Sequence, residues 1–131
     1  MTSRTNHYSG APWESIVGYC RAVHVGSQVM VSGTAPVGTD GKVVAPGDAY
    51  LQAKRCIEII AEALAKSGCS LEDVVRTRMY VTDIGLWEHV ARAHQEAFGT
   101  VSPATTMVEV SRLIDPDMLV EIEADAILEQ D

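Results

Sequence analysis

The sequence has few cysteines that could form disulfide bonds and few basic residues that could bind an anionic partner. Its 131 residues include three cysteines, an odd number without a CxxC pair. This argues against a disulfide framework and against a structural zinc site. Ten basic residues stand against 18 acidic ones, which gives a net charge of −8, and no basic run offers a surface for a phosphate backbone. Nucleic acid is therefore an unfavoured partner.

Long apolar runs and several catalytic motifs are also missing. No apolar stretch approaches the roughly 20 residues of a membrane span, and the N-terminus has no signal-peptide core, so we expect a cytoplasmic protein without a membrane partner. His89 and His94 are five positions apart and point in different directions on a helix. There is no GxSxG elbow and no glycine-rich phosphate loop. We expect neither a metal nor another cofactor.

Alternation and helical periodicity predict the elements of one domain over residues 1–131. Residues 1–12 are mixed and polar, and we expect them to be a flexible N-terminal arm. Alternating segments predict strands at 17–25, 28–34, 74–82, 103–110 and 119–126, with a short one at 42–44. Apolar residues spaced about 3.6 apart predict helices at 49–67, after the N-cap Asp48, and at 86–98. This order indicates an α+β fold in which two helices cover one face of a sheet.

The same alternation assigns side chains to the two faces of the sheet. The helix-covered face should carry the valines and isoleucines, and in residues 74–82 we place Val75, Thr77, Met79 and Val81 together. The polar face should be either solvated or a subunit interface. Its expected members are Arg76, Arg78, Glu109, Glu121, Glu123 and Asp125.

Glu121 is the residue whose placement most suggests acid–base chemistry. It lies between Val120 and Ile122 in an otherwise apolar strand, where burial would raise its pKa into a range suited to proton transfer. The alternative, an exposed acid on a polar face, remains open. Cys20 has no activating base marked in the sequence and is interpreted as a packed strand residue. Trp87 and Phe98 lie on a helical apolar stripe and are interpreted as core.

Taken together, several segments resemble the RidA family, also called YjgF or L-PSP. They are GYCRAV at 18–23, VSG at 31–33, DVVRT at 73–77, YVTD at 80–83, PA at 103–104, VEV at 108–110, RL at 112–113 and VEIEA at 120–124. The resemblance runs from about residue 13 to 126, in order and at the expected spacings. It implies a chorismate-mutase-like fold with a mostly antiparallel six-stranded sheet and two helices on one face. It also implies a homotrimer whose inter-subunit clefts bind small carboxylates.

The best-studied members of that family hydrolyse enamines and imines to keto acids and ammonia. They use an arginine next to Pro-Ala to grip the substrate carboxylate, and Thr105 stands at that position here. A hydroxyl cannot replace the bidentate, charge-assisted grip of a guanidinium. Two more pocket positions differ, with Ala91 in place of an asparagine and Met107 in place of a cysteine. The chain therefore resembles the branch of the family that lacks the arginine.

The family positions that do match indicate which residues would act in the cleft. Glu121 would place a water and move protons, with Tyr19 as a second catalytic candidate. Ser32, Gly33, Thr105 and Met107 are the expected substrate-binding residues. Arg78, on the polar face, is expected either to grip an anionic ligand in place of the missing arginine or to pair with an acid of the same face.

Two classes of function remain open at this stage. One is hydrolytic deamination of an imine, an enamine or a related C–N bond, without the typical 2-aminoacrylate deaminase activity. The other is a protein that binds a small metabolite in the same cleft without turnover. An endoribonuclease is a weaker third reading, because the chain is acidic.

Overall fold

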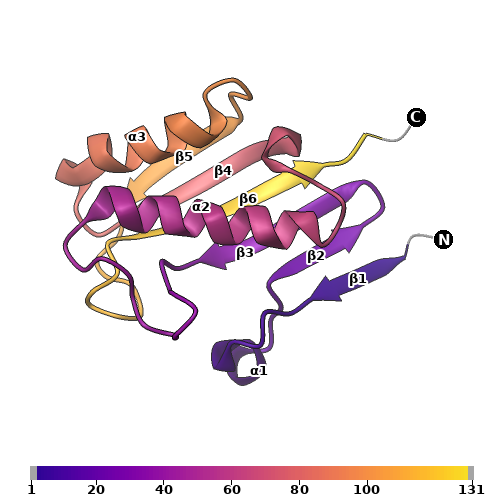
Figure 1. Ribbon diagram of the computed structural model, residues 1–131, viewed down its shortest axis with the longest axis horizontal. Coiled ribbons are helices and arrows are strands. Elements are labelled where there is room, and N and C mark those ends of the chain that lie inside the picture. Colours follow the sequence, from indigo (N-terminus) through magenta and orange to yellow (C-terminus); the bar gives the residue numbers. More distant parts are fainter. Residues whose placement is uncertain (1–2, 130–131) are drawn as a thin grey trace.

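Over residues 3–129, which the computed structural model describes, six strands form one sheet in the order β1-β2-β3-β6-β4-β5 (Figure 1). Neighbouring strands are antiparallel except for β4 and β5, which are parallel. This confirms the mostly antiparallel α+β sheet. The strands are β1 (Arg4–His7), β2 (Ala22–Val25), β3 (Gln28–Thr34), β4 (Val74–Val81), β5 (Ala104–Glu109) and β6 (Val120–Ile127).

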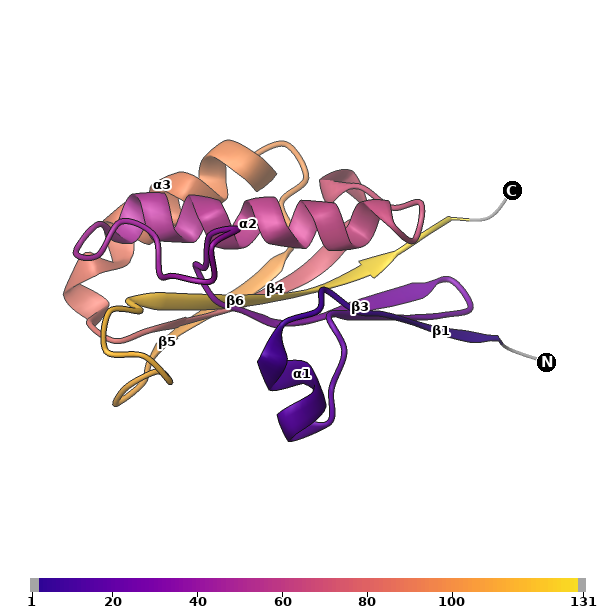
Figure 2. The ribbon, with the colours of Figure 1, turned by 60° about the horizontal axis from the view of Figure 1, so that its bottom comes forward.

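The two long helices, α2 (Ala49–Ala65) and α3 (Trp87–Phe98), pack side by side on one face of the sheet (Figures 1 and 2). The Asp48 side chain accepts a hydrogen bond from the Leu51 N–H at 3.0 Å, which confirms it as the N-cap of α2. Ile60 and Leu64 of α2 and Phe98 of α3 are fully or almost fully buried in one cluster with β6. Burial of this apolar layer is the main stabilising term of the domain.

The N-terminal segment differs from the sequence prediction. Residues 17–25 are not one strand, because a short helix α1 (Pro12–Val17) precedes β2 and ends at Gly18. Pro12 starts this helix, and Gly18 ends it with a left-handed φ of 94°, the usual proline and glycine positions of a helix. The expected flexible arm contains the edge strand β1, and its first two residues lie outside the described part. Figure 2 shows α1 on the side of the sheet opposite α2 and α3.

Two predicted face assignments are wrong, and each has a local cause. Val75 is 43% exposed, because a β-bulge between Val74 and Arg76 turns it away and buries Val74 instead. In β5, parallel pairing aligns Thr105, Met107 and Glu109 with Thr77, Met79 and Val81, which face the helices. Glu109 therefore does not belong to the open, polar face, and Val108 does.

Three smaller expectations can also be compared with the structure. The predicted short strand at 42–44 is reduced to a single bridge between Val37 and Val43. Phe98 is in the core as expected, whereas Trp87 is 50% exposed at the start of α3. The cysteines are unpaired and buried, Cys20 among them. Within residues 3–129 no helix has both the length and the apolar character needed to cross a membrane.

Candidate functional site

Glu121 lies on the open face of the sheet, against the backbone of a bulge in β3. The register between β3 and β6 shifts between Val31 and Thr34, so that Ser32 and Gly33 together face the single residue Glu123. This bulge brings the backbone of Gly33 close to the Glu121 carboxylate. A Cβ at Gly33 would lie 2.9 Å from Glu121 Oε2, so the close approach requires glycine.

Arg21 completes this part of the site. One terminal nitrogen of its guanidinium donates to the Gly33 carbonyl at 2.6 Å, and its buried Nε makes no hydrogen bond. Burial raises the pKa of Glu121 above its ordinary value of 4.5, Arg21 offsets part of the increase, and Glu123 adds to it. We call Arg21, Gly33 and Glu121 the Glu121 cluster. It presents a carboxyl group with a raised pKa in the field of a cation.

Ser32 and Tyr19 lie next to this cluster along the chain. The Ser32 hydroxyl donates to the Cys20 carbonyl at 2.7 Å, and the Ser32 N–H donates to the Arg21 carbonyl. These bonds hold the segment 20–21 beside the β3 bulge. Tyr19 is half-buried and lines a hollow of about 420 Å³ together with Tyr8 and the buried Glu14. The structure thus places Ser32, Gly33 and Glu121 together at the bulge, whereas Tyr19 lies in the hollow beside α1 and β1.

Arg78 pairs with acids of its own chain on the open face. One of its terminal nitrogens, Nη1, lies 3.2 Å from Asp125 Oδ2 and 3.6 Å from Glu123 Oε1. The Tyr80 hydroxyl also donates to Glu123 Oε1 at 2.8 Å, which raises the pKa of Tyr80. The ion-pair alternative for Arg78 therefore has its partners within the chain, and a role in holding a ligand stays a prediction.

Thr105 belongs to a different set of contacts, on the helix side of the sheet. Its Oγ1 lies 2.8 Å from Thr77 Oγ1, and Thr77 Oγ1 lies 2.8 Å from Nε2 of His94 on α3. Thr77 is fully buried, His94 is half-buried and Thr105 is exposed at the edge of the sheet. Burial lowers the pKa of His94 below 6.5. We call Thr77, His94 and Thr105 the Thr105 chain.

Sequence reasoning did not identify His94 or Thr77 as members of a site. From the sequence, His94 is considered only as a metal ligand, and Thr77 is placed on the covered face of its strand. A histidine and a threonine on two faces that must pack together are a signal for such a contact, because buried polar groups need partners.

The expected site residues therefore divide into two groups within one chain. Glu121 and Gly33 are on the open face, whereas Thr105 and Met107 are on the helix side, with Met107 paired beside Met79. Ala91, which stands where the family has an asparagine, is half-buried on α3. A six-stranded sheet separates the two groups.

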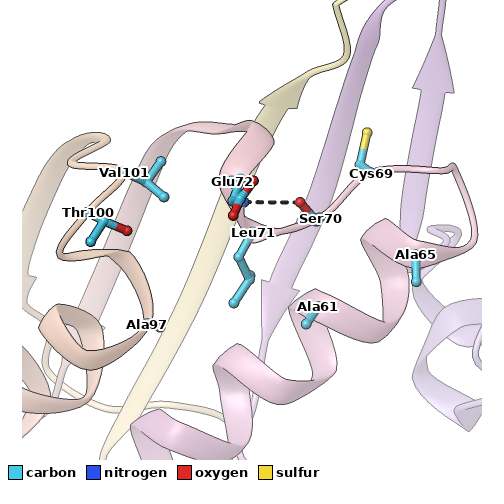
Figure 3. Close-up of a pocket in the computed structure, with 9 residues that line it drawn as sticks. All are labelled: Ala61, Ala65, Cys69, Ser70, Leu71, Glu72, Ala97, Thr100 and Val101. Carbon is cyan, nitrogen blue, oxygen red and sulfur yellow. Dashed lines mark hydrogen bonds between the residues drawn. The ribbon is translucent and has the colours of Figure 1, made fainter.

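A further hollow on the helix side carries none of the predicted residues. Figure 3 shows it between α2, the turn at residues 69–72 and the loop after α3. Three of its lining residues are alanines, and the Ser70 hydroxyl already accepts the Glu72 N–H. Among residues 3–129 no three His, Cys, Asp or Glu side chains are grouped so as to hold a metal ion.

Comparison with known proteins agrees with this fold. The family model Endoribonuclease L-PSP matches residues 9–128. Rv2704 of Mycobacterium tuberculosis, described as a member of the YjgF/YER057c/UK114 family, is 48% identical, covers 96% of this chain and 100% of its own, and has a TM-score of 0.88. An uncharacterized protein of Streptomyces coelicolor is 39% identical over 90% of this chain and 87% of its own length.

One relative carries a named activity. The 3-aminoacrylate deaminase RutC of Acinetobacter baylyi is 33% identical over 79% of this chain and 82% of its own length. The match to the family model covers most of the chain, and the solved structure shares its fold over almost the whole length. The chain therefore belongs to the Endoribonuclease L-PSP family, the YjgF or RidA family that its motifs indicated.

Proposed function

We propose that the protein is a homotrimer that hydrolyses an imine, an enamine or a related C–N bond of a small metabolite in clefts between subunits. The observation that carries this proposal is the Glu121 cluster, in which a half-buried carboxyl with a raised pKa lies over Gly33 and near Arg21. A deaminase among the relatives supports the reaction class. Glu121 is the group that would move protons.

The division of the site residues supports a cleft shared by two subunits. Glu121 and Thr105 lie on opposite faces of the same sheet, so one small ligand cannot touch both within one chain. A ligand at a subunit boundary could meet Glu121 of one subunit and Thr105 at the exposed edge strand of another. The charged open face, with Arg78, Glu123 and Asp125, would then pack against partner subunits.

The chemistry assigned to Glu121 is a hydrolysis of a protonated imine with three proton transfers. Its carboxylate takes a proton from a water as the water oxygen attacks the carbon of the C=N bond, and the protonated carboxyl then gives that proton to nitrogen. The carboxylate finally takes the hydroxyl proton of this intermediate as the C=O bond forms and the C–N bond breaks, so that a carbonyl compound and ammonia leave and the proton passes from Glu121 to solvent. A raised pKa suits a group that both takes and gives protons.

Thr105 limits which substrates the cleft would accept. It supplies no positive charge, and a charge-assisted hydrogen bond contributes roughly 1.5–3 kcal/mol. The absence of such a bond predicts little 2-aminoacrylate deamination. The same feature favours the second candidate, a cleft that binds a metabolite without turnover.

A purified-protein assay tests these statements together. Light scattering at micromolar concentration should give the mass of a trimer, and a monomer mass would contradict the shared cleft. A screen of imines and enamines generated in situ should release ammonia. Glu121→Gln should lower the rate by about 100-fold or more.

Glu58→Gln is the matched control, since it makes the same change at an exposed side chain of α2, on the other face of the sheet. It should retain the rate of ammonia release. Saturable binding without ammonia release would indicate the binding protein. Equal loss in both variants would mean that Glu121 has no special role.

A further inference from the structure

The Thr105 chain can be read as a set of directed hydrogen bonds. Thr77 has one hydroxyl hydrogen and two neighbours, His94 Nε2 and Thr105 Oγ1, each at 2.8 Å. It can donate to only one of them and must accept from the other. The Thr105 hydroxyl also lies 3.1 Å from the Pro103 carbonyl, to which it donates.

One arrangement uses every hydrogen once. His94 Nε2–H donates to Thr77, Thr77 donates to Thr105, and Thr105 donates to the Pro103 carbonyl. Thr105 Oγ1 then has one free lone pair and no free hydrogen. In the reverse arrangement the Thr105 hydroxyl donates to Thr77, and Thr105 Oγ1 again has a lone pair free toward solvent. The exposed atom of this chain is therefore a hydrogen-bond acceptor in either direction.

The polar atoms of the Thr105 chain carry no formal charge when His94 is neutral. Burial lowers the His94 pKa, and within residues 3–129 no carboxylate is hydrogen-bonded to its ring. The groups that take part in hydrogen bonds of the Thr105 chain are two hydroxyls, an imidazole and a backbone carbonyl. A ligand carboxylate at Thr105 would meet a lone pair without a cation, whereas an N–H group would be accepted.

We propose that Thr105, held in place by Thr77 and His94, accepts a hydrogen bond from an uncharged N–H group of the ligand, so that this half of the cleft selects a carboxamide over a carboxylate. Thr77 and His94 are positioning residues in this assignment. The Thr77 hydroxyl fixes which way Oγ1 of the β-branched Thr105 points, and His94 directs Thr77. The inference rests on the proposed function only in placing Thr105 in a ligand cleft.

The test compares two probes of the same size, pyruvamide and pyruvate, each titrated alone and followed by ligand-observed NMR. The protein should bind pyruvamide about three- to tenfold more tightly, the range expected for one neutral hydrogen bond. Thr105→Val should remove the preference. Thr77→Val should also remove it, because a methyl group against Oγ1 releases the Thr105 rotamer.

Thr77→Ser is the rescue variant, since it keeps the hydroxyl, and it should retain the preference. A role in stability alone would lower the stability of Thr77→Val without changing the preference, and that result would overturn the assignment. Tighter binding of pyruvate, or no binding of either probe at millimolar concentration, would overturn it as well.

The outcome is separable from that of the ammonia assay, because the preference is measured without turnover. Glu121→Gln should keep the preference for pyruvamide. A retained preference without any ammonia release would leave the inference standing and remove the hydrolase. Ammonia release without any preference for pyruvamide would support the hydrolase and overturn the inference.

Discussion

The Glu121 cluster and the Thr105 chain lie on opposite faces of one sheet, and they differ in whether their groups are charged. The Glu121 cluster places a carboxyl near a guanidinium, on a face that also carries the Arg78 ion pairs. The Thr105 chain consists of two hydroxyls and one imidazole, beneath a helix. In the Thr105 chain, the polar groups are paired with one another and are uncharged when His94 is neutral. On the open face, opposite charges lie side by side.

The two regions also differ in what holds their geometry. In the Glu121 cluster the decisive contact is between a side chain and a backbone that lacks a Cβ. In the Thr105 chain it is a series of side-chain hydrogen bonds across three elements, β5, β4 and α3. The first should therefore be sensitive to added volume, and the second to lost hydroxyls.

Gly33→Ala should lower the activity about as much as Glu121→Gln does. The new Cβ would lie 2.9 Å from Glu121 Oε2 and 3.3 Å from Glu121 Cδ, so the carboxyl must move. A shift of this size should lower any ammonia release by about 100-fold. Stability should change by less than about 1 kcal/mol, because the displaced atoms are the end of a flexible side chain.

Gly85→Ala is the matched control for that variant. Its Cβ would meet Asp83 Oδ1 at 3.0 Å, also the end of an acidic side chain, in the turn before α3. Ammonia release should be unchanged there, as measured by steady-state kinetics beside urea unfolding. An equal loss of rate in both variants would remove the special role of the contact at Gly33.

The pH dependence of stability should have opposite signs in the two regions. The folded pKa of Glu121 is raised, so its contribution to the free energy of unfolding is full below about 4.5 and is lost as pH rises through the folded pKa. The folded pKa of His94 is lowered, so its contribution is full above about 6.5 and is lost as pH falls.

Urea unfolding at a series of pH values and one protein concentration measures both contributions. The difference between the parent protein and Glu121→Gln should decrease as pH rises, and the difference from His94→Gln should decrease as pH falls. A change in the same direction with rising pH for both differences would contradict the comparison. If the difference between the parent protein and one of these variants does not change with pH, burial does not hold the replaced group neutral.

Arg78→Met should have the smallest effect on the stability of the chain. Its side chain is 40% exposed beside Asp125, and such pairs contribute about 0–1 kcal/mol. The variant should weaken assembly, seen as dissociation in light scattering at low protein concentration. An intact trimer that no longer binds a small anion in calorimetry would instead assign Arg78 to the ligand.

The candidate site could be predicted from the sequence only in part. Glu121 was identified from its place between Val120 and Ile122, and the structure places it where burial raises its pKa. The close contact with Gly33 was not predictable, because it depends on a bulge that a one-residue difference between β3 and β6 creates. Thr77 and His94 were missed because they are 17 residues apart and meet only when α3 packs on β4.

By itself, the sequence determined the two long helices, most of the strands and the family, because periodicity and motif spacing are properties of neighbouring residues. It also determined that Thr105 and Glu109 share one face of their strand. Only the tertiary structure decided whether this is the helix-covered face or the open face of the sheet. Alternation is the same on both sides of a strand, and the parallel pairing of β5 with β4 turns Thr105 toward α3 and away from Glu121.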